Sequence, residues 1–196
     1  MEVIRAVSPN LINYGGVQME FSNLIEARRS IRSYDASKKV TQEQINEMVE
    51  AAIQAPSWKN SQTARYYAIL SEEKLAQFNS ECLPEFNAKN AAGAALIVST
   101  FVANRAGFDR EGNADNEVGN GWGFYDLGLH NENLVLKAKD MGLDTLIMGI
   151  RNADSIRAML DIPETETVVA VIAVGYATKE ADKPKRKTPE DIVKFY

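Results

Sequence analysis

The apolar positions of residues 41–57, TQEQINEMVEAAIQAPS, recur at the three- and four-residue spacing of a helix with one buried face. Thr41 and Gln44 have the spacing of a capping box, which predicts that the helix begins there. Pro56 predicts its end, because the residue before a proline is disfavoured in helical conformation. The stripe that this helix would bury consists of Ile45, Met48, Val49, Ala52 and Ile53.

Similar signals predict four more helices. Ser22 is placed to cap a helix over NLIEARRS, Ser71 one over SEEKLAQFNS, and Asn152 one over NADSIRAMLDI. A long helix is expected from Phe124 onward, and Gly142 supplies the left-handed residue that often follows a helix.

Four segments have the short apolar or β-branched runs that are typical of strands: RYYAIL, the second half of AAGAALIVSTFVA, DTLIMGI and TVVAVIAVGYA. The order of elements is helices first, then strands that alternate with helices. This order predicts an α/β (α+β) fold, a three-layer sandwich with a central mixed β-sheet and helices on both faces.

Composition and charge narrow the possible functions. The chain of 196 residues has 45% hydrophobic and 25% charged residues, which is ordinary for a globular protein. Its formal charge of -5 provides no general attraction for nucleic acid. Cys82 is the single cysteine, and the longest apolar run falls short of the roughly 20 residues of a membrane-spanning helix. No secretory signal is recognised, so we expect a cytoplasmic protein without a membrane partner.

The sequence lacks the usual catalytic constellations. His130 is the only histidine, and no glycine-framed serine accompanies it, which argues against a catalytic triad. The sequence indicates no metal site, and GNGWGF at 119–124 lacks the third glycine and the preceding strand of a dinucleotide fingerprint. What remains is chemistry that a cofactor carries while the protein binds and orients it.

A basic cluster in EARRSIRSYD, residues 26–35, is the first candidate binding site. Arg28, Arg29 and Arg32 stand close together in an acidic chain, and an anion nearby would offset their mutual repulsion. Ser30 adds a donor that suits a phosphate oxygen. The alternative is a solvated basic face that the flanking acids neutralise.

Three further segments could complete a site. In APSWKNSQ, Ser57, Asn60 and Gln62 offer the donors and acceptors that a flavin or nucleobase edge requires, although such residues also form ordinary turns. Gly149, after LIM, would allow a flat ligand to approach the backbone, or simply form a turn. Lys185 and Arg186 belong to a basic run near the C-terminus, which could equally be a solvated tail.

In their order and spacing, these four segments resemble the FMN-dependent nitroreductase family, from about Met19 to the end of the chain. RRSIRSY is similar to its arginine-serine signature, APSWKNSQ to its Pro-Ser-x-x-Asn-x-Gln segment, GLDTLIMG to its strand beside the flavin, and GYATKEADKPKRKTPEDIV to its ending. The resemblance implies a single FMN-binding domain over residues 19–196 and an N-terminal extension over residues 1–18. It assigns FMN binding to Arg28, Arg29, Ser30, Arg32, Pro56, Ser57, Trp58, Asn60, Gln62, Leu146, Ile147, Met148, Gly149, Lys185 and Arg186.

The resemblance also implies an intertwined homodimer with FMN at the subunit interface, in which the Pro56–Gln62 segment comes from the other subunit. Its activity would be transfer of a hydride from NADH or NADPH through flavin N5 to a small electron-poor acceptor by a ping-pong mechanism, without a catalytic side chain. The choice between Lys185 and Arg186 as the phosphate contact stays open. Alternatives are another reaction of reduced flavin, such as dehalogenation or enal and enoate reduction, a non-catalytic FMN-binding protein, and an interaction module without a nucleotide.

Two sequence features bear on the acceptor. Where many family members have Pro-Trp after the glutamine, this chain has Thr63, Ala64 and Arg65, so the edge of the pocket should differ. The region 104–123, rich in Gly, Asn and Asp, is expected to be a long loop. Its aromatic residues either cover the flavin as a lid or anchor the loop to the core; they are Phe108 and Trp122, with Phe124 directly after the loop.

Overall fold

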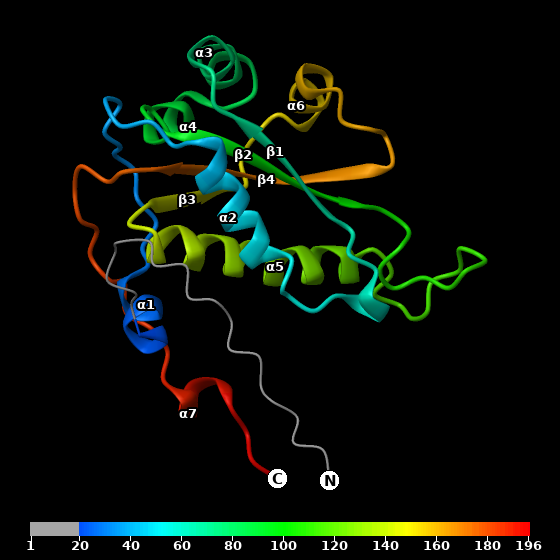
Figure 1. The fold of residues 1–196 in the computed structure, drawn as a ribbon. Helices are drawn as coiled ribbons and strands as arrows, with labels where there is room; N and C mark the ends of the chain where they lie inside the picture. The colour runs from blue at the N-terminus through cyan, green and yellow to red at the C-terminus, as the bar shows by residue number, and fades with distance from the viewer. Residues whose placement is uncertain (1–19) are drawn as a thin grey trace, which may run out of the picture.

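The structure is a computed structural model and describes residues 20–196 (Figure 1). The expected extension over residues 1–18 lies outside the described residues. The helices are α1 Phe21–Ala27, α2 Gln42–Ala52, α3 Glu72–Glu81, α4 Glu85–Asn90, α5 Gly121–Asp140, α6 Ala153–Leu160 and α7 Pro189–Ile192, with a 3-10 turn, η1, at Trp58–Asn60. The strands are β1 Ala64–Ile69, β2 Ala95–Val102, β3 Asp144–Met148 and β4 Glu166–Gly175.

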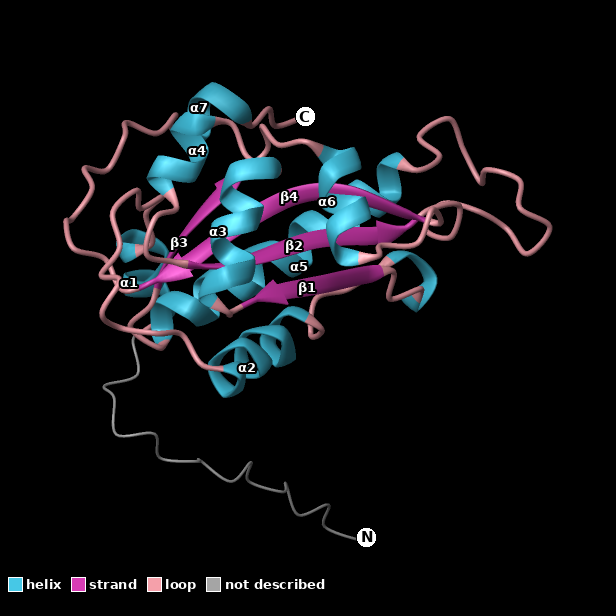
Figure 2. Ribbon diagram, turned by 90° about the horizontal axis from the view of Figure 1, so that it is seen from above, coloured by secondary structure: helices cyan, strands magenta, loops and turns pink. Residues whose placement is uncertain are grey.

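The four strands form one sheet in the order β1-β2-β4-β3, and all three pairings are antiparallel (Figure 2). The expectation of a mixed sheet is therefore wrong for these strands. β2 and β3 run in the same direction, but β4 lies between them and runs opposite to both. Within residues 20–196, the parallel pairing is confined to an isolated bridge between Ser30 and Thr145.

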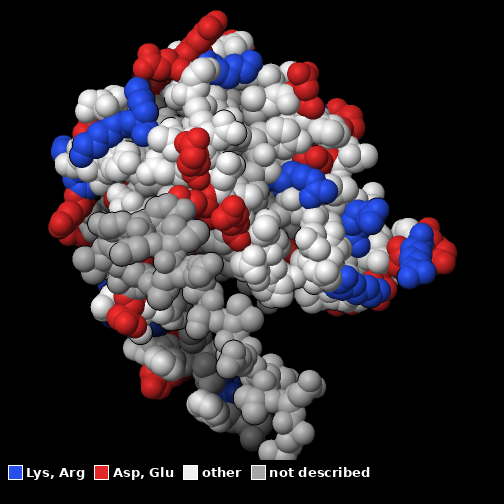
Figure 3. All heavy atoms as spheres, viewed as in Figure 1, with Lys and Arg blue, Asp and Glu red and all other residues white. Residues whose placement is uncertain are grey.

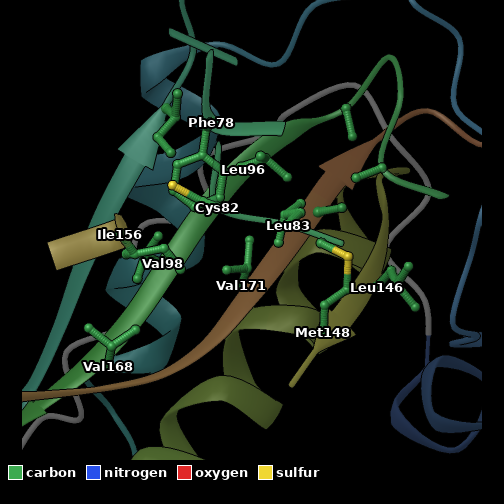
Figure 4. Close-up of a cluster of buried hydrophobic side chains, with 14 of the residues drawn as sticks. Phe78, Cys82, Leu83, Leu96, Val98, Leu146, Met148, Ile156, Val168 and Val171 are labelled. Carbon is green, nitrogen blue, oxygen red and sulfur yellow. The ribbon is translucent and has the colours of Figure 1, made fainter. Parts of the chain in front are cut away.

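Two apolar cores on opposite faces of the sheet confirm the three layers. Alternate residues of β2 point to opposite faces, so Leu96 and Val98 pack on one side and Ala95 and Ile97 on the other. The first face is covered by α3, α4 and α6 (Figure 1), and Figure 4 shows side chains of this core, among them Phe78, Leu96 and Val171. The second face is covered by α2 and the long helix α5 (Figure 1).

Most of the helix signals are confirmed. Thr41 and Gln44 form both hydrogen bonds of the capping box at the start of α2. Ser71 and Asn152 cap α3 and α6, and Gly142 after α5 has a φ of 76°. The short helices α4 and α7 were not expected from the sequence.

The expectation for the first helix is wrong in two respects. Ser22 does not cap α1; the N-cap is Glu20, which makes no capping hydrogen bond with its side chain. The helix also ends at Ala27, so the arginines that follow are not helical, and Arg28 has extended φ and ψ of -62° and 129°. The reason is tertiary, because the next residues pair with β3. No helix within residues 20–196 is long and apolar enough to cross a membrane.

Candidate functional site

The arginine segment lies along the open edge of β3. The N–H of Ile31 donates to the carbonyl oxygen of Thr145 at 2.9 Å, next to the bridge between Ser30 and Thr145. Ile31 is buried, whereas Ser30 and Arg32 on either side of it are exposed. This alternation anchors the segment through one apolar residue and leaves its polar groups available to a ligand.

The three guanidinium groups of the segment have different surroundings. Arg29 donates to the carbonyl oxygen of Arg28 at 2.6 Å, and Arg32 donates to that of Ser30 at 3.2 Å. Arg28 is half-buried, and its guanidinium makes no hydrogen bond or ion pair with any residue in the range 20–196. A partly buried cation without an anionic partner is a suitable contact for a phosphate.

The basic tail reaches the same corner of the molecule. Lys183 forms an ion pair with Glu26 of α1, and this contact lowers the pKa of Glu26, with smaller contributions from the charges of Arg29 and Arg186. Lys185 and Arg186 are exposed. On the face shown in Figure 3, basic and acidic side chains are interspersed.

Strand β3 offers its backbone, not its buried side chains, to this corner. Leu146 and Met148 are buried in the core under α3, α4 and α6, whereas Ile147 on the other face is 48% exposed. The carbonyl of Thr145 points to the open edge, so by the alternation of an antiparallel ladder the N–H and C=O of Ile147 do so too. The N–H of Gly149 has no hydrogen-bond partner in the described chain, and a Cβ built on Gly149 would meet no atom within 4 Å.

Asn87 of α4 is a residue of this corner that the sequence reasoning missed. Its side chain is 6% exposed, and its Nδ2 donates to the carbonyl oxygen of Ile150 at 2.8 Å. This bond fixes the chain just after Gly149. An asparagine in a six-residue helix carries no signal in the sequence that would have identified it.

The Pro56–Gln62 segment has an unusual backbone. Lys59, Asn60 and Gln62 all have positive φ, at 48°, 55° and 48°. Such conformations cost free energy in residues other than glycine and persist only where the surroundings enforce them. Pro56, Asn60 and Gln62 are exposed, while Ser57 is half-buried and its Oγ accepts the N–H of Gln62 at 3.0 Å.

Contacts from α5 and from the long loop hold this segment. The N–H of Trp58 donates to Oδ2 of Asp126 at 2.8 Å, and its Nε1 donates to Asp115 at 3.2 Å. Lys59 forms an ion pair with the same Asp115 at 2.8 Å. The rings of Trp58 and Trp122 lie 4.4 Å apart between centroids.

Trp122 and Phe124 make anchoring contacts from the first turn of α5, which begins at Gly121 and not at Phe124 as expected. Trp122 packs on Trp58 and donates its Nε1 to Asn116 at 3.0 Å, and Phe124 packs edge-on against Phe101 of β2. Phe124 remains 49% exposed. Phe108 forms an isolated bridge with Ala114 inside the loop.

Asp126 is a buried acid with few partners. It is 4% exposed, and burial raises the pKa of its carboxyl, while the Trp58 N–H and the charge of His130 act in the opposite direction. His130 is itself buried, and its Nδ1 bonds the main-chain oxygen of Asp126 at 2.9 Å. This arrangement holds the histidine to its own helix, not to a nucleophile.

Helix α5 separates the two halves of the expected site. The Pro56–Gln62 segment is attached to its start at Asp126, whereas α1 shares a groove with Leu136 and Asp140 near its end. Asp126 and Asp140 are fourteen residues apart, which corresponds to about 21 Å along the helix axis at about 1.5 Å per residue. One chain thus brings together the arginine segment, the β3 edge and the basic tail, but not the Pro56–Gln62 segment.

Ala64 and Arg65 border a cavity, whereas Thr63 is buried. Arg65 donates to the carbonyl oxygens of Gln62 and Ala64 at 3.0 and 2.8 Å. With Gln62 and His130 it lines a cavity of about 580 Å³ between α2 and β1. The departure from Pro-Trp therefore places a cation at the rim of this cavity.

Residues 25–176, which include the arginine segment, η1 and the β3 edge, match the model of the nitroreductase family. The chain belongs to this family. A curated relative, "Putative NAD(P)H nitroreductase MhqN" of Bacillus subtilis (strain 168), is 24% identical over 203 residues, which cover 90% of this chain and 98% of the relative. Protein DrgA of Synechocystis sp. is 26% identical over 86% of this chain and 89% of its own length.

Solved structures of other proteins have the same fold. The structure of a "putative nitroreductase in complex with FMN" from Exiguobacterium sibiricum 255-15 superposes with a TM-score of 0.75 at 25% identity, over 91% of this chain and 98% of that one. The enone reductase CLA-ER superposes with a TM-score of 0.79 at 18% identity, over 90% of this chain and 97% of its own. At that identity the second likeness concerns the fold alone.

Proposed function

We propose that the protein is an FMN-dependent oxidoreductase that passes a hydride from NADH or NADPH through flavin N5 to a small electron-poor acceptor, such as a nitroaromatic or a quinone. The observation that carries the proposal is the meeting of the Arg28–Arg32 segment with the open edge of β3. Family membership, the NAD(P)H in the name of the Bacillus subtilis relative and the FMN in the Exiguobacterium structure support it.

The residues at this corner suit FMN in their chemistry. The guanidinium of Arg28 lacks an anionic partner within residues 20–196, and Ser30 beside it is an exposed donor. These two residues, with Arg29, Arg32 and either Lys185 or Arg186, would hold the phosphate and ribityl chain. The open N–H groups of Ile147 and Gly149 would serve the isoalloxazine edge.

Bound FMN would supply the hydride chemistry, and the chain would bind and orient it. The protein contributes cations at the phosphate, backbone donors at the ring edge and an apolar wall that includes the exposed side chain of Ile147. Since the side chains of Leu146 and Met148 point into the core, these two residues would contact the flavin through backbone atoms only. No acid or base on a side chain is required for these roles.

We further propose a homodimer in which the partner supplies the Pro56–Gln62 segment. Asp126 of α5 and Asp115 of the long loop hold this segment, and within residues 20–196 no hydrogen bond or ion pair joins it to the arginine segment. The red C-terminal segment of Figure 1 extends away from the rest of the molecule. Its side chains Phe195 and Tyr196 are 93% exposed and fully exposed, respectively. Groups of exposed apolar side chains, such as those of this segment, are typical of surfaces that a second subunit covers.

We propose that residues 19–196 form the single FMN-binding domain. A chain that starts at Met19 should then bind FMN and assemble as the full chain does. Loss of either property would assign a structural role to residues 1–18.

The experiment that tests the proposed function is an absorbance spectrum of the purified protein from 300 to 600 nm, repeated anaerobically after addition of NADH and then NADPH. Flavin bands that bleach rapidly with either nucleotide support the oxidoreductase and establish which donor it prefers. Flavin bands that do not bleach favour a non-catalytic FMN-binding protein. A protein that stays colourless after incubation with FMN would refute the assignment of the arginine corner.

A further inference from the structure

We infer that Asp126 is a positioning residue for the flavin: from α5, it caps the 3-10 turn η1 and thereby holds the Pro56–Gln62 segment in the shape that binds FMN. The inference rests on the proposed function, in which this segment contacts the flavin of the partner subunit. Asp126 itself is not assigned a contact with FMN.

The first step concerns the cap of η1. The first N–H groups of a helical turn have no partner within the turn, and the side chain of the N-cap residue commonly accepts one of them. Ser57 is the N-cap of η1, but its side chain makes no capping hydrogen bond, because its Oγ accepts the N–H of Gln62. The N–H of Trp58 is accepted by Asp126 instead, at 2.8 Å.

This division of roles shapes the segment. With the cap supplied from outside, Ser57 can close the loop onto Gln62, and the residues between them take the positive φ values of Lys59 and Asn60. If the bond from Asp126 were lost, the N–H of Trp58 would have no hydrogen-bond partner among the described residues, and η1 would lose its attachment to α5. The segment would then relax toward ordinary turn geometry, because its left-handed residues are intrinsically unfavourable.

The second step concerns the cost of this arrangement. Asp126 is 4% exposed, and within residues 20–196 no lysine or arginine forms an ion pair with it. A buried carboxylate with one backbone donor is an expensive way to stabilise a helix. A function for the segment that depends on its exact shape would explain why a carboxylate stands at this place.

Four variants separate positioning from charge and from folding. Asp126→Asn keeps an acceptor oxygen at the same distance and loses the charge, whereas Asp126→Glu keeps the charge and moves it by one methylene. Asp126→Ala removes the acceptor. Glu132→Ala, an exposed acid six residues further along α5, is the matched control.

The measurement is the Kd for FMN, from the quenching of flavin fluorescence on titration with apoprotein, together with the oligomeric state by light scattering and the melting temperature. We expect Asp126→Ala to weaken FMN binding by about tenfold or more, and Asp126→Asn to stay within about threefold of wild type. Asp126→Glu should be weaker than Asp126→Asn, and Glu132→Ala should match wild type. If Asp126→Ala does not fold, the order of the Asn and Glu variants still decides.

A folded Asp126→Ala that binds FMN like wild type would overturn the inference, as would a Glu variant that binds more tightly than the Asn variant. A purely structural role would lower the melting temperature without this order of affinities. Wild-type protein that fails to bind FMN would refute the proposed function itself, which is a different outcome from wild-type binding with unaffected variants.

Discussion

The N–H of Ile31 donates to the carbonyl oxygen of Thr145 at 2.9 Å, which holds the arginine segment against the open edge of β3. The two residues are 114 positions apart in the sequence, and each lies in a motif that is weak when considered alone. Their contact places the arginine side chains, which suit a phosphate, beside the free backbone groups at the edge of β3. The predictions below test the parts of that site and the packing that supports it.

Arg28→Ala should weaken FMN binding strongly. Removal of a charged donor from a phosphate costs about 1.5–3 kcal/mol, which corresponds to a roughly ten- to hundredfold higher Kd. Arg110→Ala, which removes an exposed arginine on the long loop, is the matched control and should leave Kd unchanged. Equal affinities in the two variants would show that Arg28 does not contact the phosphate.

Gly149→Ala should separate folding from flavin binding. A Cβ at Gly149 meets no atom within 4 Å in the chain, so the free energy of unfolding should change by less than about 0.5 kcal/mol. The added methyl group would nevertheless stand where the flavin edge is expected, and crowding there should cost about 1 kcal/mol or more of binding free energy. Unchanged FMN affinity in the folded variant would place the flavin elsewhere.

Two glycines of α5 provide a paired test of the core. A Cβ on Gly123 would lie 2.4 Å from the buried ring of Phe101, so Gly123→Ala should lower the free energy of unfolding by about 1–3 kcal/mol. Gly128 lies on the same helix with open space around it, so Gly128→Ala should raise that free energy by about 0.5–1 kcal/mol. Urea denaturation at one protein concentration measures both, and changes of the same sign would contradict the packing described for α5 against β2.

The titration of Asp126 should make stability depend on pH. Burial raises its pKa in the folded protein, so its contribution to stability is fully present below the usual pKa of an aspartate, about 3.9, and is lost as the pH rises through the raised value. Asp126→Asn cannot titrate. Its melting temperature should therefore rise relative to wild type between about pH 3 and pH 7. The control Glu132→Gln should not show this trend, and parallel pH curves for wild type and Asp126→Asn would contradict the direction of the shift.

The elements that depend on neighbours in the chain could be predicted from the sequence. The capping box of Thr41 and Gln44 and the stop at Gly142 follow from contacts within a few residues, and the structure has both. The apolar runs that predicted β2 and β4 are buried in the sheet, as such runs usually are. The four motifs identified the family, because their order along the chain is itself a property of the sequence.

The contacts between distant segments were decided by the tertiary structure. Arg28 is extended, not helical, because the segment that follows it pairs with β3, and this long-range pairing overrides the local preference for a helix. The sheet is antiparallel because β4, the last strand in the sequence, lies between β2 and β3. Met148 points into the core because of its place in the register with β4.

Trp58 and Asp126 meet across 68 positions, and no local pattern encodes such a hydrogen bond. The sequence alone determined the elements, the motifs and the family, because these rest on near neighbours and on order; which groups meet at the site depends on packing that only the folded chain defines.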